Sequence, residues 1–570
     1  MNTSNHTTTV IKPAQTLTGG VHLVDNKAQS TTAKIETCPL PERLLLPLNM
    51  HSGADALVVV EIGDAVTKNQ IIAEAGGSVS AFVHSPVNGT VADIKLMPVI
   101  NRSELEEMVV VIDVTQEAAV QDSSVSNSVS NSESSSESSS ESSSNKNSEK
   151  EAWTNYSNEE LLQQIEQAGI VGLGGAGFPT HKKISSSNIS SNCHTLLLNG
   201  AECEPYISCD DVTMREHSSD ILKGALILAR MLNIATIQIA IEDNKPEAIS
   251  SMTMAIQALN QDDFSAKFEV ISIPTMYPSG GEKQLIEIIT GQQVTSQQFP
   301  ASLGYIVQNI GTILAVYNAV IKKTPLIDRV VTVSGEAISR PGNYLVALGT
   351  PIHHLLDFAG WNETNTKTLI HGGPMMGFAL SSANLPIVKS TNCIIAATPN
   401  EFPEMESERA CIRCGQCADV CPASLLPQQL FWYSQTGELN KAEDYNIMDC
   451  IECGACSYVC PSQIPLVDYY RFTKGEIKTR AAITEKAERS KVRFDFRNER
   501  LENIKLEKAE LKAERARLAA ENRKKNESSF DPSSDTSVKR DLVAEALARV
   551  EAKKKEKALA LSKLEGTDDV

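Results

Sequence analysis

The pattern of apolar and polar positions divides the 570-residue chain into stretches of different periodicity. Residues 41–120 contain short apolar runs separated by glycine turns, which is typical of β-strands in a small barrel or sandwich. Between residues 154 and 325, strand-length apolar runs alternate with longer stretches of helical spacing. Residues 326–385 are again β-rich, and the segment after Lys474 consists mainly of Ala, Glu, Lys and Arg. The pattern therefore predicts a multidomain protein that combines α/β and β domains.

The alternation between residues 154 and 325 predicts a parallel sheet. A helical pattern starts at Asn158 and ends at Gly169, and a buried strand follows at 195–199. Residues 225–241 combine a helix with another strand, and polar residues interrupt this apolar stretch, so it is too short to cross a membrane. Strands that are separated by helices pair in parallel, because the helix carries the chain back along the sheet.

The charged segment 476–570 predicts a helical, partly disordered tail. Apolar residues repeat there every seven positions, but charged residues take two of three places at the second heptad position, so the pattern is too weak for a coiled coil. The two sets are Ile504, Leu511 and Leu518, and Leu501, Lys508 and Arg515. The sequence Phe530-Asp531-Pro532 predicts a break. A second helix is expected from Asp541, with Val543, Leu547 and Val550 on one face.

Composition adds a linker and a charge pattern. Between Ser123 and Lys150, 16 of 28 residues are serine, so residues 121–153 predict a disordered linker that cannot bury enough apolar surface to fold. The net charge of -19 argues against nucleic acid as a general partner. Residues 471–570 carry +6 and the rest of the chain -25. The sequence has no signal-peptide pattern and no membrane-spanning run, so we expect a soluble chain in a reducing compartment.

Eight of the thirteen cysteines form two copies of the pattern C-x2-C-x2-C-x3-C-P. The copies are Cys411, Cys414, Cys417 and Cys421, and Cys450, Cys453, Cys456 and Cys460. This is the spacing of bacterial ferredoxins, in which the fourth cysteine of each motif ligates the other cluster. It predicts a ferredoxin-like domain over residues 400–475 with two [4Fe-4S] clusters. The ligand sets are Cys411, Cys414, Cys417 and Cys460 for cluster 1, and Cys450, Cys453, Cys456 and Cys421 for cluster 2. Zinc prefers paired CxxC motifs, and disulfides need an oxidising compartment.

A glycine-rich loop follows the helix that ends at Gly169. The residues Gly172-Leu-Gly174-Gly175-Ala-Gly177 contain a formal GxGxxG. A dinucleotide fingerprint normally follows a strand, whereas a helix precedes this loop, so the motif alone is weak and a structural turn is the alternative. Glycines without a Cβ nevertheless let backbone N–H groups approach a phosphate closely.

The loop and three downstream segments together resemble the NADH-oxidising flavin subunit of respiratory complex I. The segments are Asn199-Gly-Ala-Glu-Cys-Glu-Pro, Gly280-Gly-Glu-Lys and Gln308-Asn-Ile-Gly-Thr. The resemblance implies one pocket that holds FMN, with NADH stacked on it. The implied FMN residues are Gly172, Gly174, Gly175, Lys183, Asn199, Glu282, Gln308, Asn309 and Thr312. Phe178 and Glu204 would face the nicotinamide nucleotide.

The sequence departs from that family at three positions of the pocket. Leu173 replaces a basic residue of the loop, Ala201 replaces an acidic residue beside the flavin, and Lys283 replaces the second Glu of Gly-Glu-Glu. These changes weaken the expectation for NAD(H) more than that for FMN. Simpler interpretations also stay open: Asn199 as a strand-end turn residue, and Glu202 or Glu204 as a solvated surface carboxylate.

Two further segments resemble known domains. Gly63-Asp-Ala-Val and Pro86-Val-Asn-Gly-Thr-Val are similar to the barrel-sandwich fold of biotinyl and lipoyl carriers, but no lysine occupies the hairpin turn, so we expect a structural barrel. Residues 333–344 with Gly349-Thr-Pro-Ile resemble the SLBB β-grasp domain that follows the flavin domain in complex I. The turn His371-Gly-Gly-Pro-Met-Met-Gly is expected to be structural.

This domain order, together with "GLGGAGFPTHKK", "YPSGGEKQL" and "HGGPMMG", resembles the RnfC family, the C component of the Rnf/Rsx ion-translocating electron-transport complex. The implied order is an N-terminal segment, a barrel-sandwich hybrid, the linker, a Rossmann-like FMN/NADH domain, an SLBB domain, a two-[4Fe-4S] domain and the tail. The domain limits are 1–40, 41–120, 121–153, 154–325, 326–385, 400–475 and 476–570.

The resemblance implies a peripheral subunit on the cytoplasmic face of a bacterial inner membrane. It would belong to an ion-translocating oxidoreductase and pass electrons between NAD(H), ferredoxin-type carriers and membrane-embedded subunits. Two alternatives stay open: a soluble flavin/iron–sulfur corrinoid reductase, and an iron–sulfur electron wire without flavin. Flavin content and co-isolation with membrane subunits would distinguish them.

Overall fold

The computed structural model describes residues 10–102, 105–115, 153–186, 193–259, 266–295, 298–404, 406–528 and 537–564. The chain forms two units, Met1–Ile477 and Lys478–Val570, which we describe separately. The linker predicted for residues 121–153 and the break predicted at 530–532 lie outside the described residues, apart from Trp153.

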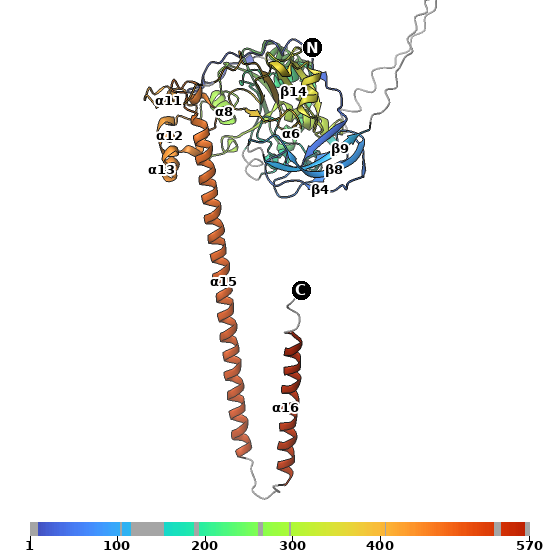
Figure 1. Cartoon of the computed structure of the whole chain (residues 1–570), viewed down its shortest axis with the longest axis vertical. Coiled ribbons are helices and arrows are strands. Elements are labelled where there is room, and N and C mark those ends of the chain that lie inside the picture. Colours follow the sequence, from blue (N-terminus) through green and yellow to red (C-terminus); the bar gives the residue numbers. More distant parts are fainter. Residues whose placement is uncertain are drawn as a thin grey trace, which may run out of the picture. The chain divides into compact units, whose positions relative to one another are not determined.

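The first unit contains a five-stranded parallel sheet, and two helices that accompany it, α6 (Ser218–Leu232) and α8 (Glu282–Thr290), are labelled in Figure 1. Its order is β1 (Val10–Ile11), β12 (Lys267–Ile273), β11 (Thr236–Glu242), β10 (Thr195–Gly200) and β13 (Tyr305–Asn309). The predicted parallel sheet is therefore confirmed, with β1 as an addition that the sequence did not indicate. The accompanying helices are α2 (Asn158–Gln167), α3 (Thr180–Ser185), α5 (Cys209–Glu216), α6 (Ser218–Leu232), α7 (Pro246–Ala258), α8 (Glu282–Thr290) and α9 (Ile310–Val320). Short 3-10 turns occur at Trp153–Asn155 and Pro300–Leu303.

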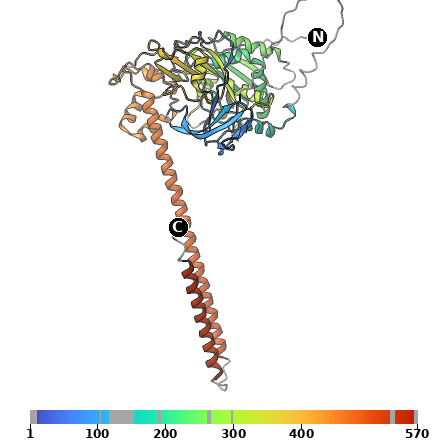
Figure 2. The ribbon, with the colours of Figure 1, turned by 45° about the vertical axis from the view of Figure 1, so that its right-hand side comes forward.

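Residues 43–114 fold into two small antiparallel sheets, seen in blue in Figure 2. One contains β3 (Arg43–Pro47), β9 (Glu106–Val114), β8 (Gly89–Pro98) and β5 (Ala65–Val66), and the other β4 (Leu57–Val58), β6 (Ile71–Glu74) and β7 (Val83–His84). Their apolar side chains share one core with the parallel sheet. The buried Lys389 adds a polar link, because its Nζ donates to the carbonyls of Phe82 and Gly169 at 2.7 and 2.8 Å.

A mixed six-stranded sheet follows the flavin-like region. It contains β14 (Asp328–Ser334), β15 (Gly342–Ala347), β16 (Thr368–His371), β17 (Phe378–Leu380), β18 (Cys393–Ala397) and β2 (Glu36–Thr37), with α10 (Ile352–Phe358) and a 3-10 turn at Glu363–Asn365. The sheet extends past the predicted limit at residue 385, because β18 pairs with both β14 and β16.

The cysteine-rich region is built from short helices. They are α11 (Gln416–Asp419), α12 (Pro427–Thr436), α13 (Leu439–Asp444), a 3-10 turn at Ile447–Asp449 and α14 (Ala455–Tyr458). The next helix, α15 (Leu466–Glu527), passes through the predicted domain limit at 475 without interruption. Its first turns belong to the core of the cysteine-rich region, where Ile477 is only 5% exposed.

The second unit contains the rest of α15 and α16 (Ser537–Leu564), so the second helix starts before the predicted Asp541. Leu501, Leu511 and Leu518 are exposed, in agreement with the weak heptad pattern. Within the ranges given above, no helix is long and apolar enough to cross a membrane.

Residues 10–38, here called the N-terminal strap, run along the first unit. The strap contributes β1 to the parallel sheet and β2 to the mixed sheet. Between these strands, Val21 pairs with Tyr277, and the amide of Gly20 donates to the carbonyl of Val420 at 2.9 Å. The strap thus connects both sheets with the cysteine-rich region.

Candidate functional site

The glycine loop lies between α2 and α3, beside the carboxyl end of β13. Its ends are joined by hydrogen bonds from the Gly172 amide to Phe178 O at 2.8 Å and from the Gly177 amide to Gly172 O at 3.2 Å. Gly175 has a φ of 120°, which favours glycine, and a Cβ there would meet no atom within 4 Å. The loop therefore presents open backbone to a ligand.

Two of the predicted FMN residues hold this loop against α9. The buried Thr312 accepts a hydrogen bond from the Leu173 amide at 2.9 Å. Asn309 is the N-cap of α9, because its Oδ1 accepts from the Thr312 amide at 3.3 Å. Its Nδ2 donates to Asp210 at 2.6 Å. The N-terminal turn of α9 consequently lies beside the loop, where N–H groups and the helix dipole favour an anion.

The other predicted flavin residues converge on the same edge of the sheet. Lys183 donates to Glu282 at 2.9 Å and to the Val307 carbonyl at 2.7 Å. Asn199, at the end of β10, donates to the carbonyl of Gly280 at 2.9 Å. Ligands of parallel α/β sheets bind at the carboxyl ends of the strands, which is where these side chains meet.

Gln308 gives an independent indication of a ligand. Its side chain is buried, and its Nε2 has no hydrogen-bond partner among the described residues. A buried amide donor without an acceptor is costly, so it is a candidate contact for a bound polar group. The open loop, the Lys183 ammonium and this unpaired donor fit a flavin nucleotide.

The two predicted nicotinamide residues have different surroundings. Phe178 is 40% exposed next to the glycine loop. Glu204 is enclosed: its Oε1 accepts from the amides of Met375 and Met376 at 2.7 and 2.9 Å. Burial raises the pKa of Glu204, although the two amides oppose that shift. The turn 371–377, expected to be structural, therefore has Glu204 as its anchor.

Glu202 is not the solvated surface carboxylate that the sequence allowed, because it is buried and caps the start of α5. Its carboxylate accepts from the amides of Asp210 and Asp211 at 2.9 and 3.2 Å and from Cys209 Sγ at 3.3 Å. Burial, followed by the charge of Glu202, raises the pKa of Asp210 to about 7. Both oxygens of Glu202 are occupied, so this group holds α5 in place.

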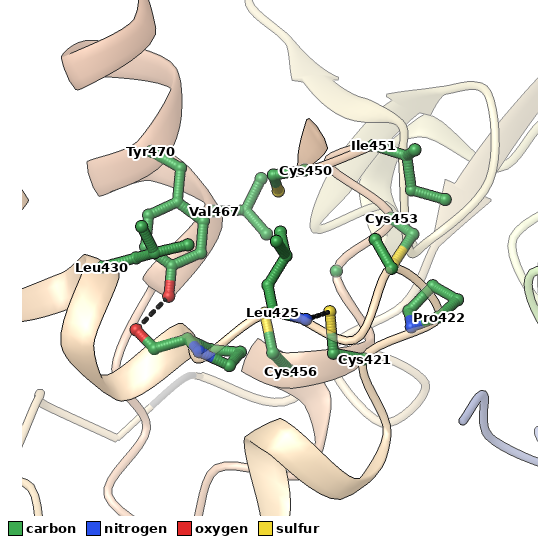
Figure 3. A pocket seen from close by; sticks show the side chains of 13 residues that line it. Cys421, Pro422, Leu425, Leu430, Cys450, Ile451, Cys453, Cys456, Val467 and Tyr470 are labelled. Atoms are coloured by element: carbon green, nitrogen blue, oxygen red, sulfur yellow. Dashed lines mark hydrogen bonds between the residues drawn. The ribbon is translucent and has the colours of Figure 1, made fainter. Parts of the chain in front are cut away.

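The eight motif cysteines surround two cavities. Figure 3 shows the side chains that line the first, called the inner cavity. Its sulfur atoms come from Cys421, Cys450, Cys453 and Cys456. Apolar side chains complete the wall, among them Leu430, Val467 and Tyr470, and the Leu425 amide donates to Cys421 Sγ at 3.4 Å.

The second, or outer, cavity is lined by residues of both motifs. Its sulfur atoms come from Cys411, Cys414, Cys417 and Cys460. Cys414 is exposed and the neighbouring Ile412 is 68% exposed, so this cavity lies at the surface. Each cavity combines three cysteines of one motif with the last cysteine of the other. All eight thiols are free, and four thiolates around one space fit a cubane cluster.

The inner cavity adjoins the flavin-like region. Tyr277 Oη donates to the carbonyl of Cys453 at 2.5 Å. A Cβ on Gly454 would lie 2.9 Å from the Met375 carbonyl, and one on Gly19 of the strap 2.8 Å from the Cys421 carbonyl. These contacts connect segments distant in the sequence, so no local pattern could have indicated them.

Four family models match the chain. Residues 15–117 match the RnfC barrel sandwich hybrid domain, and residues 165–318 the Nuo51 FMN-binding domain. Residues 330–379 match the SLBB domain and residues 410–464 the 4Fe-4S dicluster domain. The predicted fold class is therefore confirmed, and the chain has cofactor domains for FMN and for two [4Fe-4S] clusters.

Several curated relatives are RnfC proteins, named as the C component of the ion-translocating oxidoreductase complex. The protein from Yersinia enterocolitica is 42% identical over 86% of this chain and 65% of its own length. The Pseudomonas aeruginosa protein is 42% identical over 85% of this chain and 58% of its own length. The Yersinia pestis bv. Antiqua (strain Antiqua) protein is 41% identical over 86% and 73%. The chain thus spans less than two thirds of the length of the first two relatives, 65% and 58%, and 73% of the third.

A solved structure, the NAD+-reducing [NiFe]-hydrogenase in the H2-reduced state, is similar at a TM-score of 0.40 and 18% identity. The match covers 54% of this chain and 60% of that one. The sequence relatives are much more similar, and together with the four domain matches they show that the chain belongs to the RnfC family of ion-translocating oxidoreductase complexes.

Proposed function

We propose that this chain passes electrons between NAD(H) and two iron–sulfur clusters through a bound FMN, as the peripheral electron-transfer subunit of an ion-translocating membrane complex. The observation that carries the proposal is the contact between the flavin-like region and the inner cavity, made by Tyr277 and Cys453. The naming of the relatives supports the membrane complex. Its partners would be integral subunits and a ferredoxin-type carrier, on the cytoplasmic face of the inner membrane.

The residues of the flavin-like region would bind and orient the cofactor. The loop 172–177 would place backbone N–H groups near the phosphate, and the start of α9 would add its dipole. Lys183, Asn199 and Glu282 would contact the rest of the flavin, and Gln308 would gain an acceptor for its unpaired amide. Bound FMN supplies the exchange of a two-electron hydride for single electrons, which a cubane cluster requires.

The same proposal includes the cysteine ligands and their order. Cys421, Cys450, Cys453 and Cys456 would hold the inner cluster, and Cys411, Cys414, Cys417 and Cys460 the outer one. Because the inner cavity adjoins the flavin-like region and the outer one lies at the surface, the inner cluster would exchange electrons with the flavin. The outer cluster would exchange electrons with the partner protein.

The test is an anaerobic preparation of the full chain. We expect flavin in the denatured extract, iron and sulfide for two clusters, and loss of flavin and cluster absorption on addition of NADH. A preparation with both clusters but no flavin would favour the electron wire. Flavin that dithionite reduces but NADH does not would remove NAD(H) from the proposal, which is the part weakened by Leu173, Ala201 and Lys283.

A further inference from the structure

Four segments of the first unit meet in one small apolar cluster. Val21 of the strap, Tyr277, Cys453 and Ala455 are its buried members. Cys203, Met375 and Val420 pack around them and are partly buried. The cluster thus joins the flavin-like region, the strap, the turn 371–377 and the wall of the inner cavity.

Tyr277 is fixed at both ends within this cluster. Its backbone exchanges two hydrogen bonds with Val21, at 2.8 and 3.0 Å. Its side chain is buried, and its hydroxyl donates to the carbonyl of Cys453. The ring is therefore held by the strap at its backbone and by a residue of the cysteine motif at its hydroxyl, which also faces the carboxylate of Glu204.

The residues directly after Tyr277 form the turn that the flavin site uses. The Ser279 amide donates to Met276 O at 2.8 Å, and the Gly281 amide to Pro278 O at 3.1 Å. Gly280 accepts from Asn199 through its carbonyl, and its amide donates to Cys203 Sγ at 3.3 Å. Tyr277 consequently lies three residues before Gly280, which accepts from the candidate flavin residue Asn199. It also contacts Cys453 of the inner cavity directly.

We propose that Tyr277 is a positioning residue for electron transfer, which holds the inner cluster against the flavin site and raises the reduction potential of that cluster. This inference rests on the proposed function. The oxygen of the Cys453 carbonyl carries a partial negative charge, and the hydroxyl proton of Tyr277 offsets that charge through the hydrogen bond. Reduction adds negative charge to a cluster, so hydrogen bonds in its surroundings favour the reduced state.

The decisive variant is Tyr277→Phe, which removes the hydroxyl and keeps the ring. We expect FMN and iron contents equal to those of the wild type, but a lower midpoint potential of the inner cluster and an unchanged outer cluster. At a fixed potential, the ratio of reduced to oxidised inner cluster should fall by about threefold to tenfold, the effect of one hydrogen bond. An EPR-monitored redox titration of the full chain measures both clusters, and Cys421→Ala identifies the inner signal by its loss.

The matched control is Tyr344→Phe. Tyr344 is also buried, and its hydroxyl donates to the backbone carbonyl of Arg340 in the mixed sheet. This variant should leave both potentials unchanged. Tyr277→Leu removes the ring as well and should lower the FMN or inner-cluster content, which Tyr277→Phe retains.

Two results would overturn the inference: an unchanged inner potential in Tyr277→Phe, or loss of the inner cluster in that variant, which would make the hydroxyl a requirement for folding alone. Failure of the proposed function gives a different result, because the wild-type chain itself would then lack flavin or one of the clusters.

Discussion

The two cysteine motifs have the same spacing and the same backbone, but different surroundings. Arg413 and Glu452, at the same place in the two motifs, both have a φ of 58°. A Cβ on Gly415 in the outer motif would meet nothing within 4 Å, whereas one on Gly454 would lie 2.9 Å from the Met375 carbonyl. The spacing therefore determines how four sulfur atoms surround a space, and the neighbouring domains determine which space is enclosed.

The comparison also supports the different roles proposed for the two clusters. In the inner motif Cys453 and Cys456 are buried and Cys453 contacts Tyr277, whereas the outer motif has Cys414 exposed. An electron carrier needs one centre near its source and one that a partner can approach. A duplicated motif can supply both centres, because the flavin-like region covers one copy and leaves the other at the surface.

The largest expected effect is that of removing a crossed ligand. Cys421→Ala should destroy the inner cluster, although Cys421 belongs to the outer motif, because its sulfur lines the inner cavity. Cys460→Ala should destroy the outer cluster instead. Iron analysis should show a loss of about half the iron in each variant. EPR should show which signal disappears, and loss of the outer signal in Cys421→Ala would contradict the crossed arrangement.

Loss of the flavin should prevent NADH from reducing the two iron–sulfur clusters. Gly174→Asp places a carboxylate where the phosphate would approach the loop, so we expect loss of FMN and of NADH-dependent reduction. Both clusters should remain reducible by dithionite, because the cysteine-rich region has a core of its own. Gly174→Ala is the control: its Cβ would lie 3.4 Å from Asn309, an ordinary contact, so much of the FMN should stay. Full flavin occupancy in the aspartate variant would rule out this pocket.

The sequence predicted those features of the fold and site whose pattern lies within a short stretch of residues. Cysteine spacing predicted the two sets of sulfur atoms, and the alternation of helices and strands predicted the parallel sheet. The glycine loop and its companion segments pointed to residues that meet at one edge of that sheet, such as Lys183, Glu282 and Asn199.

The sequence did not predict features that depend on contacts between residues far apart in the chain. The strap has strands of only two residues and no periodicity, so its pairing with β12 and β15 had no sequence signal. The hydrogen bond between Tyr277 and Cys453 joins residues 176 positions apart. Gly475 stands close to the point in α15 where buried residues give way to exposed ones, but an isolated glycine weakens a helix without ending it. The predicted limit at 475 therefore fell inside a continuous helix.

A smaller effect is expected on stability, because the two motifs carry different charges at the matched positions Glu452 and Arg413. Glu452 contacts Arg471 and Lys474, both at 3.0 Å, beside the inner cavity. Glu452→Gln should destabilise the inner region by about 1 kcal/mol, the upper range for partly exposed ion pairs. Arg413→Gln changes a charge at the same place in the outer motif and should have no comparable effect. Thermal unfolding followed by cluster absorption measures both, and equal shifts would show that the surroundings do not matter.

The effect of Glu452 has a defined pH dependence. Burial alone raises the pKa of Glu452, but the hydrogen bond and charge of Lys474, together with Arg471, lower it below its ordinary value of 4.5. A lowered pKa stabilises the folded state above the unfolded value, and this contribution is lost as the pH falls through the folded pKa. The difference between wild type and Glu452→Gln should therefore be constant from roughly pH 6 to 8 and shrink only below about pH 4.5.

The smallest expected effect is that of removing the second unit. Truncation should follow Lys478, because Ile477 is buried and Lys474 donates to the Cys450 carbonyl at 2.5 Å. The shortened chain should keep both clusters and FMN, whereas truncation before Leu466 removes Val467 and Tyr470 from the inner cavity and should cost that cluster first.

Membrane association of the shortened chain tests whether the tail is an anchor. A basic residue near an anionic surface contributes about 1 kcal/mol, but the acidic residues interleaved with those of the tail cancel most of that attraction, leaving +6 over residues 471–570. Attachment should therefore come from partner subunits, and the chain that ends at Lys478 should still sediment with membranes that contain them. If it stays in the supernatant with both clusters intact, the tail provides the attachment, and the charge argument is wrong.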